Sequence, residues 1–276
     1  MTTTTQPTSE WAIDRVDLSA YLERIGYTAS VTPDAGTLRR LHRAHAATIA
    51  FENVDIVLGQ TIELDLDSVQ DKLVRRPRGG YCFEHNALFA AVLERIGFTV
   101  TRLAARVQPA KPGPRTHMLL RVEADDRPWL ADVGFGASLL EPLPMRRATV
   151  QQGDWSYRLQ DADHDGWLLE QLGPEGWFDL YAFTPEPQRP IDYAVYNHYT
   201  ATHPRSPFVG QVVALRTQDD ARDALRGLEL TRTRPDGDAE SRQVEPDEVP
   251  DVLAERFAIE LEPERAARLR RVLSAN

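Results

Sequence analysis

Apolar residues in the first third of the chain recur with the spacing of an α-helix. After Asp17, a good N-cap, apolar side chains stand at i, i+3, i+4 and i+7 over residues 18–25, and Gly26 follows as a stop signal. A second helix is predicted after Thr32-Pro33, where a capping residue precedes a proline suited to the first helical position. A third is predicted over 82–96, with a buried stripe and a terminal glycine at Leu88, Phe89, Val92, Leu93, Ile96 and Gly97.

Beyond residue 98 the pattern changes to short runs of alternating or β-branched and aromatic residues. Turn-forming residues separate these runs at 124–127, 163–166 and 173–176. The pattern predicts an antiparallel sheet or a small barrel. The predicted strands include His117–Glu123, Trp129–Val133, Trp167–Leu172 and Trp177–Phe183.

The last part of the chain mixes both patterns. A proline-rich link over 184–190 leads to a short predicted helix, and the charged stretch 218–251 is typical of a solvated hairpin and loop. Helical, then β, then mixed segments predict an α+β fold. The elements expected after the link are a helix at Tyr193–Tyr199, strands at Phe208–Arg216 and Leu228–Thr233, and helices at Asp247–Phe257 and Glu264–Leu273.

Composition and charge narrow the functional classes. The 276 residues are 42% hydrophobic and 27% charged, as in an ordinary globular protein, and the net charge of −10 argues against binding to nucleic acid. No apolar run approaches the roughly 20 residues that a membrane span needs, and the N-terminus has no signal-peptide pattern. We therefore expect a cytoplasmic protein that binds neither nucleic acid nor a membrane.

The only cysteine, Cys82, is the first candidate for chemistry. It can form no internal disulfide and no multi-thiolate zinc site, so no metal is expected. It follows Gly79-Gly80 and opens the third predicted helix, whose N-terminus favours a negatively charged sulfur. A buried structural cysteine is the usual role of a lone thiol, but this setting favours a nucleophile.

A nucleophilic thiolate needs a base, and His117 is favoured among the seven histidines. Its predicted strand is followed, after a short turn, by a strand that ends at Asp132. A two-residue loop closed by Glu123 and Asp126 would place His117 directly opposite Asp132, and a four-residue loop would make them diagonal neighbours on the same face. An odd loop or a bulge would separate them.

The residue patterns say less about the roles of Asp132 and of the other histidines. Asp132 could equally bond the turn over 133–136. The ring of His85, three positions after Cys82, could follow the helix rather than face the thiol. The remaining histidines fit packing or surface roles or carry no further signal: His42, His45, His164, His198 and His203.

The segment Arg78-Gly79-Gly80-Tyr81-Cys82-Phe83-Glu84-His85-Asn86 resembles the Arg-Gly-Gly-x-Cys-x-Glu-x-Asn signature of arylamine N-acetyltransferases. The similarity is collinear over about 21–208, although Ala50 and Ala201 stand where the family often has proline and serine. The further segments that carry it are Phe51-Glu52-Asn53-Val54, His117-Met118-Leu119-Leu120, Asp132-Val133-Gly134-Phe135-Gly136 and Asn197–Phe208.

The resemblance implies an N-terminal helical bundle over 1–97 that carries the nucleophile, an antiparallel β-barrel over 98–190 that carries the histidine and aspartate, and an interdomain helix plus α/β lid over 191–276, with a papain-like core. It implies a catalytic triad of Cys82, His117 and Asp132. It further implies an ion pair between Glu52 and Arg78, coenzyme contacts at Thr116 and Gly136, and an acceptor pocket lined by Phe51, Phe135 and Phe208.

The activity implied is ping-pong transfer of an acetyl group from acetyl-CoA through a Cys82 thioester to an aromatic amine or hydrazine. Because CoA is anionic and the chain acidic, local basic groups are needed, and Arg75, Arg76, Lys111 and Arg115 are the candidates. A papain- or transglutaminase-like hydrolase would share the triad. A macrolactam-forming amide synthase, which would take its acyl group from a carrier protein, also resembles this family. A non-catalytic binding module is disfavoured because all three triad positions are intact.

Overall fold

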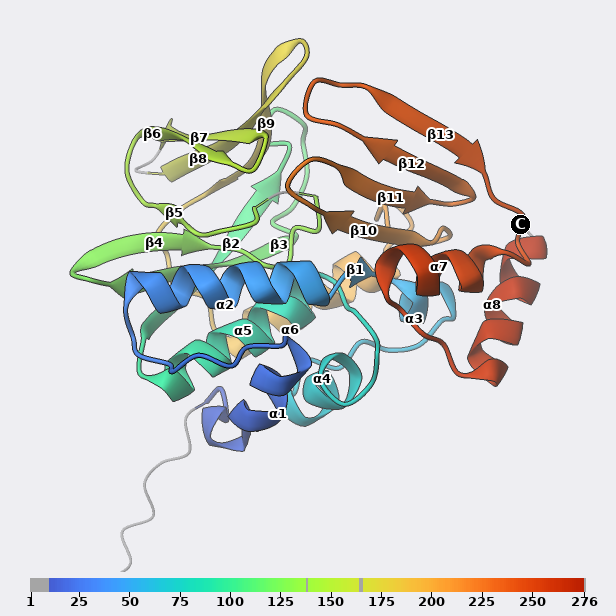
Figure 1. The fold of residues 1–276 in the computed structure, drawn as a ribbon, viewed down its shortest axis with the longest axis horizontal. Helices are drawn as coiled ribbons and strands as arrows, with labels where there is room; N and C mark the ends of the chain where they lie inside the picture. The colour runs from blue at the N-terminus through green and yellow to red at the C-terminus, as the bar shows by residue number, and fades with distance from the viewer. Residues whose placement is uncertain (1–9, 138, 164–165, 276) are drawn as a thin grey trace, which may run out of the picture.

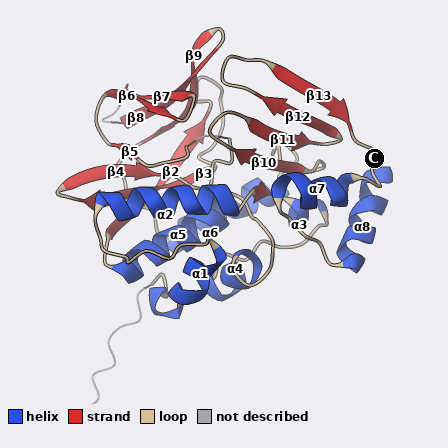
Figure 2. Cartoon of the chain, viewed as in Figure 1, coloured by secondary structure: helices blue, strands red, loops and turns tan. Residues whose placement is uncertain are grey.

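The computed structural model describes residues 10–137, 139–163 and 166–275. Its helices and two antiparallel sheets are arranged as Figures 1 and 2 show, with the N-terminal helices packed beneath the first sheet. Side-chain caps begin three of these helices: Asp17, Asp34 and Asp65 accept backbone N–H groups. The helices are α1 (Leu18–Arg24), α2 (Ala35–Thr48), α3 (Val54–Val57), α4 (Leu66–Leu73) and α5 (Cys82–Ile96), preceded by a 3₁₀ turn at Ile13–Arg15.

Two sequence predictions in this region need correction. The cap of α2 is Asp34 rather than Thr32, because the Asp34 carboxylate accepts the N–H of Thr37 at 2.7 Å. The short helices α3 and α4 were not predicted, since neither is long enough to show a clear apolar stripe. The third helix was predicted with the bounds that α5 has, including Gly97 as its left-handed C-cap.

The first sheet has eight strands in the order β5-β4-β3-β2-β9-β8-β7-β6. Side chains from strands far apart in this order, such as Leu130, Leu119 and Tyr157, share one core, so the sheet curls into an incomplete barrel. Its strands are β2 (Thr99–Val107), β3 (His117–Ala124), β4 (Arg127–Ala131), β5 (Leu143–Pro144), β6 (Ala148–Gln152), β7 (Trp155–Ala162), β8 (Gly166–Gly173) and β9 (Gly176–Phe183).

The turn between β3 and β4 sets the register of the proposed site. Ala124 pairs with Arg127, and the two loop residues Asp125 and Asp126 both have positive φ, as a type I′ turn requires. The two-residue loop is therefore closed by Ala124 and Arg127, one residue later than the pair Glu123 and Asp126 that the sequence suggested. This register makes His117 and Asp132 diagonal neighbours on one face, the arrangement expected for an even loop.

The second sheet has the order β1-β10-β11-β12-β13 and takes its first strand from the N-terminal segment. Its strands are β1 (Phe51–Glu52), β10 (Val213–Thr217), β11 (Arg222–Arg226), β12 (Glu229–Thr233) and β13 (Ala239–Gln243), and the helices after β9 are α6 (Pro190–Thr202), α7 (Val249–Phe257) and α8 (Pro263–Ser274). One face of the sheet packs on α7 and α8 around Leu225, Leu253 and Phe257.

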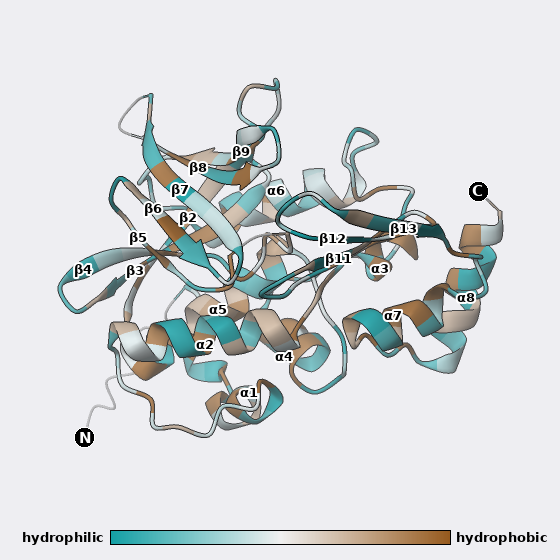
Figure 3. Ribbon diagram, turned by 45° about the horizontal axis from the view of Figure 1, so that its top comes forward, coloured by the Kyte–Doolittle hydropathy of each residue, from teal (hydrophilic) through white to brown (hydrophobic). Residues whose placement is uncertain are grey.

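The C-terminal predictions were partly wrong. The strand expected at Phe208–Arg216 begins only at Val213, and the segment 218–251 contains β11 and β13 as well as the predicted β12. All residues of β13 are exposed, and Figure 3 shows β12 and β13 as largely hydrophilic. A polar edge strand has no apolar alternation, so its sequence resembles a loop. Over the described residues, no helix has the length and apolar character that crossing a membrane requires.

Candidate active site

Cys82 is the first residue of α5, and the preceding glycines allow its close packing. A Cβ on Gly79 would overlap the carbonyl oxygen of Ala50, and one on Gly80 would lie 2.7 Å from the Glu84 carboxylate. The Glu84 carboxylate accepts the N–H of Tyr81 at 3.0 Å and so caps the helix. The two glycines are thus required for space rather than for a left-handed turn, and Cys82 is held at a buried helix N-terminus.

Cys82, His117 and Asp132 come together as the register predicts. His117 Nε2 lies 2.7 Å from Asp132 Oδ2, and Cys82 lies close enough to His117 to help raise the pKa of its ring. The Cys82 Sγ lies 3.6 Å from the carbonyl oxygen of Thr116. Because Asp132 engages Nε2, Nδ1 is the ring nitrogen available to the sulfur.

The surroundings favour an imidazolium at His117. Burial alone would lower the pKa of His117, but the charge and hydrogen bond of Asp132, together with Cys82, raise it to about 10. Burial would likewise raise the pKa of Asp132, but His117, Asn86 and Gly134 hold it below its usual value. At neutral pH the ring and the carboxylate therefore form a charged pair beside the thiol.

Asp132 is fixed by several donors, and some of them were not predicted. Tyr181 donates its hydroxyl to Oδ2 at 2.9 Å, and Asn86 Nδ2 and the N–H of Gly134 donate to Oδ1 at 2.9 and 3.0 Å. Asn86 belongs to the signature segment, whereas no sequence pattern pointed to Tyr181. The bond to Gly134 shows that Asp132 both engages His117 and bonds the turn over 133–136.

His42 hydrogen-bonds the backbone of Asp132, just after the end of β4. Its Nε2 accepts the backbone N–H of Asp132 at 3.1 Å, and its Nδ1 lies 3.1 Å from the carbonyl oxygen of Leu140. This pattern requires a neutral ring with the proton on Nδ1. Burial is the main reason that the pKa of His42 falls to about 4. His42 is therefore a fixed structural histidine and not a second base.

A buried chain of hydrogen bonds supports the glycine turn. His85 Nε2 lies 3.0 and 3.2 Å from the carbonyl oxygens of Gly80 and Ala50, while its Nδ1 faces His45 Nε2 at 2.8 Å. His45 Nδ1 in turn lies 2.9 Å from the hydroxyl of Tyr21. Because carbonyl oxygens only accept, His85 donates from Nε2, and a consistent chain runs from Tyr21 through both rings. His85 thus faces away from the thiol, and burial lowers its pKa to about 4.

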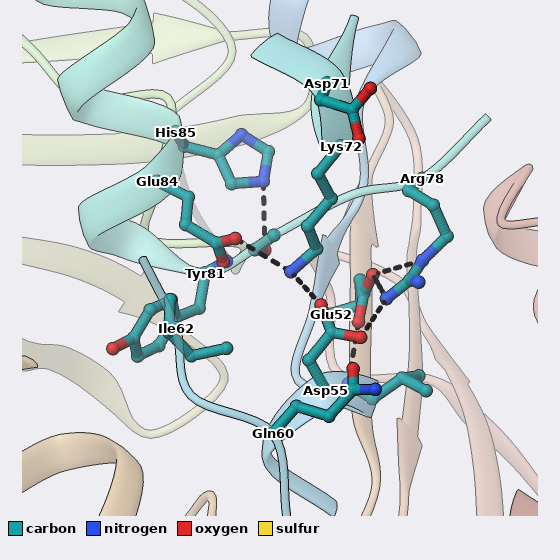
Figure 4. Close-up of polar contacts among 12 residues, drawn as sticks. Glu52, Asp55, Gln60, Ile62, Asp71, Lys72, Arg78, Tyr81, Glu84 and His85 are labelled. Atoms are coloured by element: carbon teal, nitrogen blue, oxygen red, sulfur yellow. Dashed lines mark hydrogen bonds and ion pairs between the residues drawn. The ribbon is translucent and has the colours of Figure 1, made fainter. Parts of the chain in front are cut away.

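A network of buried charges lies on the other side of the same turn (Figure 4). The pair expected between Glu52 and Arg78 is present, with Arg78 Nε and Nη2 at 2.8 and 2.6 Å from Oε1. Asp55 connects Arg78, at 3.0 Å, to Lys72, at 2.8 Å, and Lys72 also binds Glu84 at 2.8 Å. Arg265 of α8 adds an ion pair with Asp55.

This network balances three carboxylates against three cations and reaches the helix cap through Glu84. Sequence reasoning found only the pair of Glu52 and Arg78, because Lys72 and Arg265 stand outside the recognised segments. Burial would lower the pKa of Lys72, but the surrounding carboxylates raise it above its usual value. The network therefore holds a charged lysine beneath the turn that positions Cys82.

A cleft of about 630 Å³ opens onto Cys82 and His117. Thr116 and all three predicted pocket residues, Phe51, Phe135 and Phe208, line it. The ring of Phe135 stands edge-on to His117 with centroids 5.0 Å apart, and Phe51 lies 5.5 Å from Phe208. Gly136 instead lines a separate cavity of about 20 Å³ beside Phe51, so its predicted contact with the coenzyme lacks support from the cleft.

The basic groups of the cleft differ from those expected. Arg76 pairs with Asp71, Arg115 bonds Glu186 at 3.4 Å, and Lys111 bonds Gln108 at 2.8 Å. None of these three, nor Arg75, lines the cleft; its arginines are Arg205, Arg222 and Arg226. The expected positions were close to the triad in sequence, whereas the cationic groups come from the C-terminal segment that folds across the site.

The remaining histidines have other surroundings. His203 stacks on Tyr199 with ring centroids 4.3 Å apart, at the end of α6. His198 lies on the same helix, and His164 falls outside the described residues. In the part of the chain that the structure describes, no group of three or more His, Cys, Asp and Glu side chains is arranged to hold a metal ion.

Comparison with known proteins identifies the family. The model of an N-acetyltransferase family matches residues 34–266. An arylamine N-acetyltransferase of Mycobacterium tuberculosis H37Rv is 40% identical over 254 residues, covering 88% of this chain and 89% of that protein. The chain belongs to the arylamine N-acetyltransferase family.

Solved structures of the family agree with this assignment. The chain matches the Nocardia farcinica arylamine N-acetyltransferase with 44% identity and a TM-score of 0.89, covering 96% of this chain and 97% of that one. It also matches the Mycobacterium marinum arylamine N-acetyltransferase in complex with CoA, with 39% identity and a TM-score of 0.85 over 93% and 99% of the two chains. The α+β fold predicted from sequence, with its helical, barrel and lid parts, is therefore confirmed.

Proposed function

We propose that this arylamine N-acetyltransferase carries the acetyl group of acetyl-CoA as a thioester on Cys82 and transfers it to an aromatic amine or hydrazine. The observation that supports this most strongly is the hydrogen-bonded pair of His117 and Asp132 next to Cys82, with Cys82 and His117 lining one open cleft. A thiolate paired with an imidazolium is a ready nucleophile.

In the first half-reaction the Cys82 thiolate attacks the thioester carbonyl carbon of acetyl-CoA. The N–H of Cys82, at the first helical position, has no intrahelical acceptor and can donate to the oxyanion that forms. As the intermediate collapses, the bond from carbon to the CoA sulfur breaks, and the CoA thiolate takes the proton of the His117 imidazolium. The products are CoA and acetyl-Cys82 beside a neutral His117.

In the second half-reaction the amine nitrogen attacks acetyl-Cys82. His117 now accepts a proton from the nitrogen, the bond to Sγ breaks, and the thiolate–imidazolium pair returns. Asp132, held by Tyr181 and Asn86, keeps the ring oriented in both halves. The aromatic walls of the cleft suit an amine that is neutral at pH 7.

A free thiol is required at each turnover, which supports the expectation that the protein works in the reducing cytoplasm. Steady-state kinetics test the proposal. With acetyl-CoA and an arylamine varied together, double-reciprocal plots should be parallel, and CoA release beyond one equivalent per enzyme should require the amine. Rapid release of many equivalents of CoA without amine would instead identify a hydrolase. Acyl transfer only from a carrier protein would identify an amide synthase.

A further inference from the structure

Two arginines of the second sheet face the active-site cleft. Phe51 of β1 pairs with Leu215 of β10, and Leu215 pairs with Ala224 of β11. Paired residues share one face of a sheet, and residues two apart on a strand share it as well. Arg222 and Arg226 flank Ala224 in this way, so they lie on the face that carries Phe51, and both line the cleft.

The register also indicates how far these arginines lie from Phe51. Neighbouring strands are about 4.8 Å apart, so Ala224, two strands from β1, lies about 10 Å from Phe51. Phe51 and Cys82 line the same cleft. An acetyl-CoA whose thioester reaches Cys82 has its nucleotide end away from the sulfur along its pantetheine arm. Because Arg222, Arg226 and Cys82 line one cleft, a donor bound in it can place its nucleotide end at the β11 arginines.

Neither arginine is neutralised by the part of the chain that the structure describes. Arg222 donates to Thr217 and Gln171 at 3.3 and 3.2 Å and lies 4.5 Å over the ring of Trp155, all of which are uncharged partners. Among the described residues, no carboxylate lies within ion-pair distance of Arg222 or Arg226. By contrast, Arg232 on the neighbouring strand pairs with Asp223 at 2.9 Å.

Arg205 is a third cation of the same cleft. Asp179 lines the same cleft, and Glu229 stands opposite Arg226 in the register of β11 and β12 without forming an ion pair. Burial lowers the pKa of both Arg222 and Arg226, whereas carboxylates raise the pKa of Arg78 in the buried network. Arg222, the more buried of the two, thus loses hydration without gaining an opposite charge, and the more exposed Arg226 does so to a smaller extent.

We propose that Arg222 and Arg226 form an anion subsite that binds a phosphate group of the acetyl-CoA nucleotide. The inference rests on the proposed function, because it takes acetyl-CoA as the donor. A guanidinium group matches phosphate oxygens with paired N–H donors. The subsite would also supply the local positive charge that the sequence analysis called for, because a chain of net charge −10 repels an anionic donor except where basic side chains lie together.

The test compares two acetyl donors that differ only in the nucleotide, acetyl-CoA and S-acetylpantetheine. In a ping-pong reaction, kcat/KM for the donor reports acetylation of the enzyme alone, so the ratio of kcat/KM for the two donors measures the nucleotide contribution. Arg226→Gln should lower this ratio about tenfold, the loss of one charge-assisted hydrogen bond. Arg226→Glu should lower it further, and the double variant Arg222→Gln/Arg226→Gln should lower it most.

The matched control is Arg271→Gln, which removes one exposed positive charge from α8, and it should leave the ratio within twofold of wild type. Thermal unfolding identifies any variant that fails to fold. Arg226 is exposed, so Arg226→Gln is the variant expected to disturb folding least. 3′-Dephospho-acetyl-CoA shows which phosphate is bound: if the effect of Arg226→Gln disappears with this donor, the 3′-phosphate is the partner, and if it persists, the diphosphate is.

A ratio within twofold of wild type in Arg226→Gln and in the folded double variant would overturn the subsite. An equal loss with both donors would overturn it too, because the arginines would then act on the thioester end or on the fold. Failure of the proposed function is distinguishable, since the wild-type protein would then accept an acetyl group from neither donor.

Discussion

Replacing Lys72 by methionine tests the buried charge network beneath the catalytic turn. The Lys72 ammonium lies 2.8 Å from both Asp55 and Glu84, and its side chain is only 9% exposed. After the substitution Asp55 keeps Arg78 and Arg265, but Glu84 keeps only the N–H of Tyr81. Glu84 therefore becomes the uncompensated buried charge.

Removing one partner of a buried ion pair costs about 3–5 kcal/mol, a large part of the roughly 5–15 kcal/mol that stabilises a typical domain. Lys72→Met should lower the free energy of unfolding by that amount. Glu84→Gln removes the stranded charge and keeps an oxygen that can accept the N–H of Tyr81. The double variant Lys72→Met/Glu84→Gln should therefore lose at least about 1 kcal/mol less than the sum of the two single losses.

Urea unfolding, followed by circular dichroism and extrapolated to water, measures each loss. The only other lysine of the chain, Lys111, is exposed and bonds just Gln108, so Lys111→Met should change stability by at most about 0.5 kcal/mol. The reasoning would be refuted if Lys72→Met cost no more than Lys111→Met. Additive losses in the double variant would refute it equally.

Three further predictions concern the triad and its supports. Tyr181→Phe removes a hydroxyl donor from Asp132 and should lower kcat/KM for acetyl-CoA about tenfold; an unchanged value would contradict the role given to that bond. The pKa of His117 rises from about 6.5 in the unfolded chain to about 10 in the fold, so its contribution to stability is full below pH 6.5 and lost towards pH 10. The difference in unfolding free energy between wild type and His117→Gln should narrow over that range, and a constant difference would count against the pair. The pKa of both His42 and His85 falls to about 4 in the fold. The free energy of unfolding should therefore decrease as the pH falls from 6.5 towards 4, by up to about 1.4 kcal/mol per pH unit for each ring. Midpoints of urea unfolding that do not change between pH 6.5 and 5 would contradict this.

Local sequence patterns were enough to predict where Cys82, His117 and Asp132 lie in the fold. The apolar stripe and Gly97 defined α5, and with it the place of Cys82 at a helix start. The period of two along a strand made the shared face of His117 and Asp132 depend only on the parity of one loop. The loop proved even, although its position differed by one residue from the first alternative.

Long-range contacts could not be read in the same way. Arg265 meets Asp55 across a separation of 210 residues, and Tyr181 meets Asp132 across 49, so no spacing rule connects them. The strand β13 was missed because exposed polar residues form it, and β11 was missed because its short sequence, with Asp223 buried and Arg226 exposed, shows no clear apolar alternation. The cleft arginines were missed because their place in the fold depends on partners elsewhere in the chain. The division into segments 1–97, 98–190 and 191–276 and the catalytic roles themselves stay predictions.

The intact mass of the protein after brief exposure to acetyl-CoA alone tests the central claim most directly. The account predicts a mass increase of one acetyl group, located on the peptide that contains Cys82, absent in Cys82→Ala and lost when an arylamine is added. An unmodified mass while acetyl transfer proceeds, or an acetyl group found on any other residue, would contradict it.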